Sequence, residues 1–216
     1  SVISLDCFGN LGNINLEVSG GTGPATYTYL WDNGSATEDI VNLTPGSYSV
    51  LVTDNNNCEA TATYIVEEAS EIDIQLDAGL STLNIACNGD SDGNINIEVS
   101  GGTPDINSEY TYLWTTTNGL IPSGTDTNQD LNTLVAGDYL VTVTDSNGCE
   151  ATASYIIEEA DLIIIDLLTP TFELELECFG DVVDLDIDVS GGTGPGTYTY
   201  VWIDDVIKVC FFTLKL

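Results

Sequence analysis

An internal repeat constrains this chain more than any other feature of its sequence. The motif Val-Ser-Gly-Gly-Thr occurs three times, starting at Val18, Val99 and Val189. Before the first copy, Ile14, Leu16 and Val18 alternate with polar residues, as the inward face of a strand does. Glycine adopts positive φ without steric cost, so the paired glycines can turn the chain into a second strand. The repeat therefore predicts three copies of one strand–corner–strand element.

The second strand of each copy carries aromatic residues on one face. Tyr27, Tyr29 and Trp31 occupy alternate positions, and Trp114 and Trp202 end the equivalent segments. We expect all three tryptophans in the core, because a strand with one apolar face buries that face. The alternative is an aromatic platform for stacking on sugar rings, which would require the indoles to face solvent.

A tyrosine follows a turn glycine at the start of a later strand in two of the copies. The segments are Pro45-Gly46-Ser47-Tyr48 and Ala136-Gly137-Asp138-Tyr139. This spacing resembles the tyrosine corner of immunoglobulin-like sandwiches, so we expect both rings to be buried and both hydroxyls to bond the preceding loop. No segment has helical periodicity. The sequence thus predicts an all-β chain of tandem immunoglobulin-like β-sandwich domains in an elongated array.

The repeat period divides the chain into three domains, which we expect at residues 1–68, 69–160 and 161–216. The first strand of the first domain is expected to be incomplete. The third domain follows the pattern as far as Trp202 and then departs from it, since residues 203–216 lack the Gly-x-Tyr corner and the Thr-Asp hairpin. Without an initiator Met or a signal peptide, the chain is expected to be a piece of a longer, processed protein.

Charge excludes several classes of partner. The chain has 35 Asp and Glu residues against 2 Lys, with no Arg or His, and a formal net charge of −33. Nucleic acid is excluded as a partner because two lysines are too few to neutralise phosphate, and an anionic membrane surface is disfavoured. No stretch approaches the roughly 18 apolar residues of a membrane-spanning helix. The simplest interpretation is an acidic face that keeps a secreted protein soluble.

Calcium is the one ligand that the carboxylates suggest, and no other cofactor is expected. Asp90 and Asp92 alternate like the ligands of a calcium loop, although an Asx-rich turn explains them more simply. Hard carboxylates also recur at the junctions between units, where bound Ca²⁺ would stiffen a hinge. A solvated linker is the alternative there. The junction residues are Glu67, Glu68, Glu158 and Glu159.

The sequence offers no catalytic residues. It contains no His and no general base beyond generic carboxylates, and these carboxylates form no recurring pair in a pocket-like setting. The glycine-rich loop after Val18 precedes a proline and a strand, whereas a phosphate-binding loop precedes a helix. We therefore expect no enzymatic activity.

Cysteine usage points to an oxidising compartment and leaves the pairing open. Cys7 and Cys87 precede the first turn of their units, Cys58 and Cys149 follow the last hairpin, and Cys178 is the counterpart of Cys7 in the third unit. Counting suggests bonds within units, Cys7–Cys58 and Cys87–Cys149. In a sandwich, however, these turns lie at opposite ends, about 20 Å apart, while bridged Cα atoms lie within roughly 7 Å.

Stacking the units head to tail removes this conflict. The early turn of one unit then meets the late hairpin of the next, which places Cys7 near Cys149 and leaves Cys87 for a hairpin that the third unit lacks. We favour this interdomain pairing, and the intradomain Cys7–Cys58 bond remains the alternative.

Together these motifs resemble a known repeat. Val-Ser-Gly-Gly-Thr, Tyr-Thr-Tyr-x-Trp and Leu-x-x-Gly-x-Tyr-x-Val-x-Val-Thr-Asp-x-x-x-Cys are similar to the SprB-type repeat of very large cell-surface adhesins in gliding Bacteroidota. The resemblance covers the first two units and the first half of the third. PKD-type modules, which are immunoglobulin-like, share some of these elements more distantly. The resemblance implies a surface-displayed array exported by type IX secretion, with no catalytic residues.

The expected function is that of a structural or adhesive segment of a large extracellular adhesin or surface filament, acting in attachment or gliding motility. Its expected partners are neighbouring repeats, copies of the same protein or a surface polysaccharide. One alternative is an array of carbohydrate-binding modules. The other is a subunit of a non-covalent filament whose incomplete units accept strands from neighbouring chains.

Overall fold

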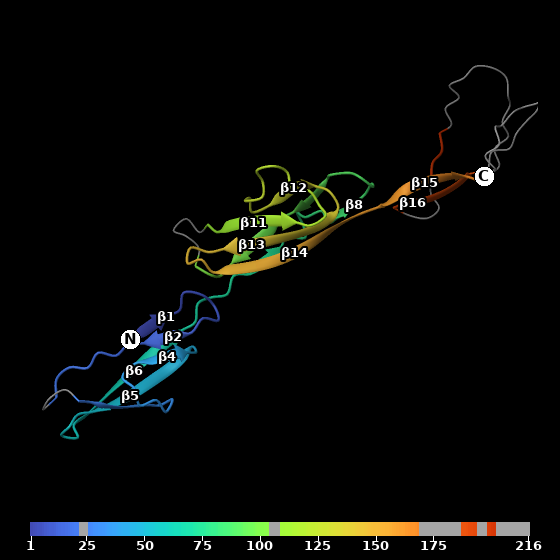
Figure 1. The fold of residues 1–216 in the computed structure, drawn as a ribbon. Coiled ribbons are helices and arrows are strands. Elements are labelled where there is room, and N and C mark those ends of the chain that lie inside the picture. Colours follow the sequence, from blue (N-terminus) through green and yellow to red (C-terminus); the bar gives the residue numbers. More distant parts are fainter. Residues whose placement is uncertain (22–25, 104–108, 169–186, 194–197, 202–216) are drawn as a thin grey trace, which may run out of the picture.

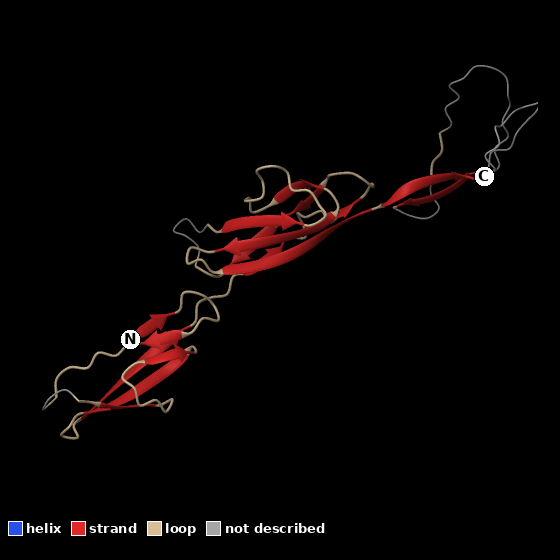
Figure 2. Ribbon diagram, in the orientation of Figure 1, coloured by secondary structure: helices blue, strands red, loops and turns tan. Residues whose placement is uncertain are grey.

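The computed structural model describes residues 1–21, 26–103, 109–168, 187–193 and 198–201. Every regular element in these ranges is a β-strand (Figure 2), so the described chain has no helix that could cross a membrane. We refer to residues 1–68 as unit 1, residues 69–160 as unit 2, and residues from 161 onward as unit 3. Figure 1 shows the described parts of these units following one another from lower left to upper right.

Unit 1 is a small sandwich of two sheets. Its larger sheet has the strand order β1 (Val2–Ser4), β6 (Glu59–Glu67), β5 (Gly46–Thr53), β3 (Thr28–Trp31). Its smaller sheet pairs β2 (Gly12–Ile14) with β4 (Ile40–Leu43). Strand β1 runs parallel to β6, and the other pairs are antiparallel.

Unit 2 repeats this plan and adds a strand pair. Its larger sheet has the order β11 (Thr111–Thr116), β13 (Gly137–Thr144), β14 (Glu150–Glu159), β8 (Asn84–Ile85). Two short sheets face it, β12 (Leu131–Leu134) with β9 (Gly93–Ile95), and β10 (Ile97–Ser100) with β7 (Asp73–Leu76). Strand β8 is parallel to β14, as β1 is to β6.

Units 1 and 2 each bury a core of their own. Trp31 and Trp114 lie inside, whereas their sequence neighbours Leu30 and Leu113 face solvent, as the period of two predicts. Unit 1 buries Leu5, Ile14, Leu16, Trp31, Ile40, Leu43, Val50, Val52 and Val66. Unit 2 buries Ile72, Ile85, Ile95, Ile97, Trp114, Leu131, Leu134, Tyr139, Val141, Val143 and Ile157. The expected all-β fold of tandem immunoglobulin-like sandwiches is confirmed.

The inward alternation of Ile14, Leu16 and Val18 gives a shorter strand than expected in unit 1. Strand β2 ends at Ile14, and the amide of Leu16 donates to Asp39 Oδ1 at 2.8 Å. In unit 2 the equivalent amide, of Ile97, donates to Asp130 Oδ1 at 2.9 Å, and the chain then continues as β10 beside β7. Residues 16–19 have no such partner strand among the described residues, so they are not assigned as strand.

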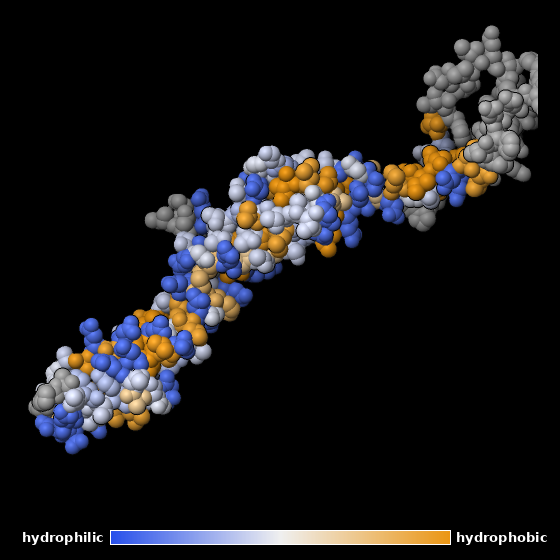
Figure 3. All heavy atoms as spheres, in the orientation of Figure 1, coloured by the Kyte–Doolittle hydropathy of each residue, from blue (hydrophilic) through white to orange (hydrophobic). Residues whose placement is uncertain are grey.

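Unit 3 is described only in part. Strand β15 (Asp161–Leu167) pairs antiparallel with β16 (Ile187–Gly192), and its apolar side chains colour this pair orange in Figure 3. Trp202, Cys178 and the divergent residues after 202 lie outside the described ranges, so the expectations about them are not tested.

Candidate functional site: the joint between units

The turn that carries Cys7 is tied to the end of its own unit. The amide of Asn10 donates to the carbonyl oxygen of Cys7 at 3.2 Å, and the amide of Gly9 donates to Glu68 Oε1 at 3.2 Å. Unit 2 repeats the arrangement, with the amide of Gly89 donating to Glu159 Oε2 at 2.7 Å. The second glutamate of each junction therefore fixes the turn that presents a cysteine.

The hairpin that carries Cys149 is built around a buried carboxylate. Asp145 is 7% exposed, and its Oδ1 accepts from the amides of Asn147 and Cys149, both at 2.9 Å. Its Oδ2 accepts from the amide of Thr103 at 2.8 Å. Charge-assisted bonds of this kind offset the cost of burying the carboxylate and hold the hairpin in one conformation.

A disulfide joins the two cysteines across the units. Cys7 and Cys149 are bonded with a Cα–Cα distance of 5.5 Å, and Asn147 Nδ2 donates to the carbonyl oxygen of Asp6 at 3.2 Å beside them. The interdomain pairing favoured from strand geometry is confirmed. The Cys7–Cys58 alternative is wrong because the two turns lie at opposite ends of unit 1. Cys58 and Cys87 are free and exposed.

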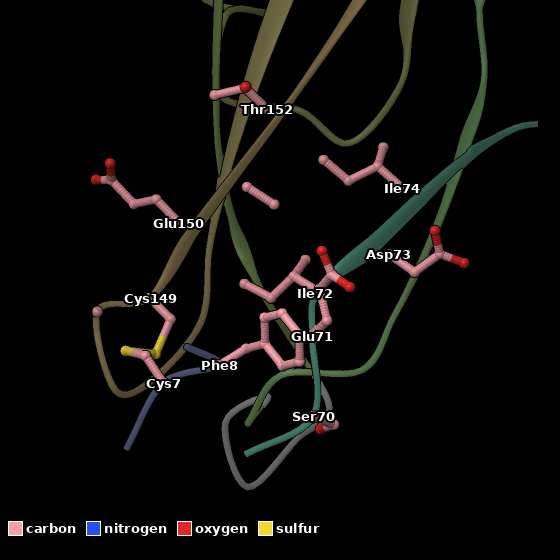
Figure 4. A pocket seen from close by; sticks show the side chains of 12 residues that line it. Cys7, Phe8, Ser70, Glu71, Ile72, Asp73, Ile74, Cys149, Glu150 and Thr152 are labelled. Carbon is pink, nitrogen blue, oxygen red and sulfur yellow. A yellow bond between two sulfur atoms is a disulfide. The ribbon is translucent and has the colours of Figure 1, made fainter. Parts of the chain in front are cut away.

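A shallow groove runs beside the disulfide (Figure 4). Phe8 of unit 1 and Glu71, Ile72 and Asp73 of unit 2 are among its lining residues, together with the first residues of β14. The groove presents carboxylates and apolar side chains but no basic group. Its chemistry is that of a covalent joint beside an exposed aromatic residue, Phe8.

The proposed calcium ligands do not gather at this joint. No group of three or more Asp, Glu, Cys or His side chains in the described chain is arranged to hold a metal ion. Glu68 and Glu159 instead bind the turns, and Glu67 and Glu158 lie in β6 and β14. Asp90 and Asp92 are exposed. Calcium therefore stays a hypothesis.

The aromatic residues occupy the core. Trp31 Nε1 donates to the carbonyl oxygen of Thr37 and Trp114 Nε1 to that of Asn128, both at 2.9 Å. Burial of these two indoles, 1% and 2% exposed, excludes them as platforms for sugar stacking. Both belong to the shared architecture of the sandwich.

The two tyrosine corners differ. The hydroxyl of Tyr139 donates to the carbonyl oxygen of Val135 and that of Tyr48 to the carbonyl oxygen of Thr44, both at 2.8 Å. The expected bonds are present in both units. Tyr139 is buried, but Tyr48 is only half-buried, so the expected burial is wrong for unit 1.

Sequence reasoning missed the roles of Asp145 and of the junction glutamates. The signal for Asp145 was the recurring Thr-Asp-x-x-x-Cys segment, because an aspartate at the start of a tight hairpin commonly accepts from amides two to four residues on. The signal for the glutamates was their recurrence before each junction alanine.

Comparison with known proteins identifies the repeat. Residues 2–36 and 80–119 match the model of the SprB repeat. The resemblance inferred from the sequence is therefore confirmed over these residues, which lie within the first two units.

No curated protein gave a match. Among solved structures, the eight N-terminal Ig domains of Down Syndrome Cell Adhesion Molecule are similar at 12% identity and a TM-score of 0.44, over 95% of this chain and 30% of that one. Titin-A168169 aligns at 15% identity and a TM-score of 0.29, over 74% and 94% of the two chains. Extracellular domains 3-5 of Drosophila OTK align at 10% identity and a TM-score of 0.31, over 88% and 72%.

Proposed function

We propose that this chain, with its SprB repeats, is a structural and adhesive segment of a large secreted cell-surface protein. It is divided into domains at residues 1–68, 69–160 and 161–216, and it acts in surface attachment or gliding motility without catalysing a reaction. Type IX secretion carries the protein to the cell surface. Its partners are neighbouring repeats or copies and an extracellular surface such as a polysaccharide.

The disulfide between successive units is the observation that carries this proposal. A bond between Cys7 and Cys149 resists separation of two units under tension, and disulfides persist outside the cytosol. The net charge of −33 adds mutual repulsion between units, which favours an extended chain over a collapsed one. A covalent, self-repelling array suits a spacer that holds an adhesive surface away from the cell.

The intact mass of the native protein tests the proposal. Antibodies raised against this chain are used to probe material released from intact cells by brief protease treatment and material from whole-cell lysates. We expect the antibodies to detect fragments in the material released from intact cells. In the whole-cell lysates we expect a band far above the 23.0 kDa of this chain. A band near that mass would contradict a segment of a large protein and favour a polymerising subunit. Absence of fragments from the released material would contradict the proposed cell-surface location.

A further inference from the structure

Unit 1 has an open strand edge where unit 2 has a paired one. In unit 2, β10 is covered by β7 with Ile97 opposite Leu76 and Val99 opposite Ile74. In unit 3, β16 is covered by β15 in the same way. The equivalent residues 16–19 of unit 1 have no covering strand within the described chain. Unpaired edges of this kind are templates for another strand.

The glycine corner of unit 1 has room for such a strand. A Cβ on Gly101 would collide with the carbonyl oxygen of Glu71, and a Cβ on Gly191 with that of Leu162, because the covering strand passes there. A Cβ on Gly20, the counterpart in unit 1, would meet nothing within 4 Å in the described structure. Close approach of a second backbone is a reason for glycine in a sheet. Unit 1 thus has, at Gly20, the glycine that close approach of a second strand requires, but no strand of the described chain approaches it.

The core of unit 1 is less complete along the same edge. In unit 2, Ile72 is buried and Ile74 and Leu76 pack against the core. No described residue takes their place in unit 1, where Leu16 is 9% exposed against 2% for its counterpart Ile97. A strand with alternating apolar residues would fill this gap.

Cys58 lies in a copy of the hairpin that carries Cys149. Asp54 Oδ1 accepts from the amides of Asn56 and Cys58, both at 2.8 Å, as Asp145 does in unit 2. Cys149 is bonded to the preceding unit, whereas Cys58 is free and exposed. In unit 2, the disulfide partner comes from unit 1, and the covering strand β7 directly follows the end of unit 1.

We propose that unit 1 is the acceptor for the end of another SprB-type repeat. That repeat supplies an extended strand with apolar residues at the positions of Ile72, Ile74 and Leu76, which covers residues 16–19. Its counterpart of Cys7 forms a disulfide with Cys58. The donor is a repeat placed ahead of unit 1, because at the joint between units 1 and 2 the cysteine comes from the preceding unit and the covering strand β7 from the segment that directly follows that unit.

Bond formation requires an oxidant. The two thiols lose two protons and two electrons, which a small disulfide such as oxidised glutathione accepts to become two thiols. The inference rests on the proposed role of the chain as a repeat array, but its tests read backbone protection and bond formation, so they can fail while surface attachment and cell-surface location hold.

Hydrogen-bond alternation identifies the amides to observe. The amide of Asp77 donates to the carbonyl oxygen of Asn96, so this opposite pair is hydrogen-bonded, and in an antiparallel ladder every second pair is. The amides of Glu98 and Ser100 therefore face β7. Their counterparts in unit 1, Glu17 and Ser19, face the open edge.

The first test joins a covering strand to unit 1. Ser1 is the counterpart of Ser81, so residues 69–80 joined directly ahead of Ser1 place β7 in register. The control extension has Ile72, Ile74 and Leu76 replaced by Ser. We expect amide exchange at Ser19 to slow by about tenfold or more with the apolar extension only, and Glu17→Pro to remove the effect. Equal exchange with both extensions would overturn the proposal. Concentration-dependent protection of Ser19 in the unextended chain would show a second copy as occupant and overturn the assigned donor.

The second test adds a whole repeat. Residues 69–160 followed by 70–80 are placed ahead of Ser1, with the original Cys87 and the added copy of Cys149 replaced by Ser. After oxidation with glutathione disulfide, peptide mapping should find Cys58 bonded to the added Cys87. When the added Cys87 is replaced by Ser, Cys58 should keep a free thiol and should therefore react with an alkylating reagent. Alkylation of Cys58 in both extended chains would overturn the proposed bond.

Discussion

Units 1 and 2 have the same plan but differ in how completely their cores are covered. Nine of the eleven buried core residues of unit 2 have a buried counterpart in unit 1. The exceptions are Ile72, which directly precedes β7, and Tyr139. Most of the shared set comes from strands that both units contain, while Leu5 and Leu16 lie just beyond the ends of β1 and β2 in unit 1. The difference comes from the segments around them.

The burial of Tyr139 depends on a loop that unit 1 lacks. Unit 2 has a long insertion after β11, and the amide of Leu120 in it donates to the hydroxyl of Tyr139 at 3.3 Å. Gly119 passes so close to the ring that a Cβ there would lie 2.6 Å from the hydroxyl. Unit 1 has a short turn at residues 32–35 instead, so Tyr48 stays half-exposed. Insertions between strands therefore change core burial without changing the strands.

Replacing the central tryptophans gives the largest effect and tests whether the two cores are equivalent. Trp31→Ala and Trp114→Ala should each cost their own unit about 3–5 kcal/mol, because a large buried side chain is lost and a cavity is left. Hydrogen exchange with mass spectrometry in increasing urea measures each unit separately.

Matched controls lie one residue away on the solvent face. Leu30→Ala and Leu113→Ala should change stability by no more than about 0.5 kcal/mol, since both side chains are exposed. If Trp31→Ala also lowered the hydrogen-exchange protection of unit 2, the two cores would not be independent. The two units would then unfold as one cooperative pair.

Removing the tyrosine hydroxyls should give a smaller effect that differs between the units. Tyr139→Phe should cost about 1.5 kcal/mol and Tyr48→Phe about 0.5 kcal/mol, within the range for one hydrogen bond. Tyr139→Phe leaves the carbonyl oxygen of Val135 and the amide of Leu120 without their hydrogen-bond partner in a site that is covered by protein. In Tyr48→Phe, water can reach the carbonyl oxygen of Thr44 and replace the lost hydroxyl. Equal losses in urea unfolding would show that the insertion does not shield Tyr139.

The sequence predicted what is local and repeated. Alternation placed Trp31 and Trp114 inside, and the length of a strand sufficed to favour Cys7–Cys149 over Cys7–Cys58. Alternation could not reveal that Tyr48 lacks a covering loop, because that depends on a segment distant in the chain. The recurrence of the junction glutamates marked Glu68 as a residue with a role, but it could not identify its partner, because that partner is the backbone amide of Gly9.

Raising the pH into the alkaline range should give the smallest of the expected differences in stability between units 1 and 2. Burial raises the pKa of Tyr112, Tyr139 and Tyr155 in unit 2, and the backbone hydrogen bonds of Tyr139 at Leu120 and Val135 lower its pKa by less than burial raises it. In unit 1, burial and then Glu38 raise the pKa of Tyr29. Above about pH 10 the unfolded chain releases these protons while the folded units retain them, so stability falls as pH rises. Unit 2 should lose more stability than unit 1 between about pH 9 and 11, and Tyr139→Phe should reduce that loss. Urea unfolding followed by hydrogen exchange, after alkylation of Cys58 and Cys87 to prevent thiol exchange, measures both units; a larger loss in unit 1 would reverse the comparison.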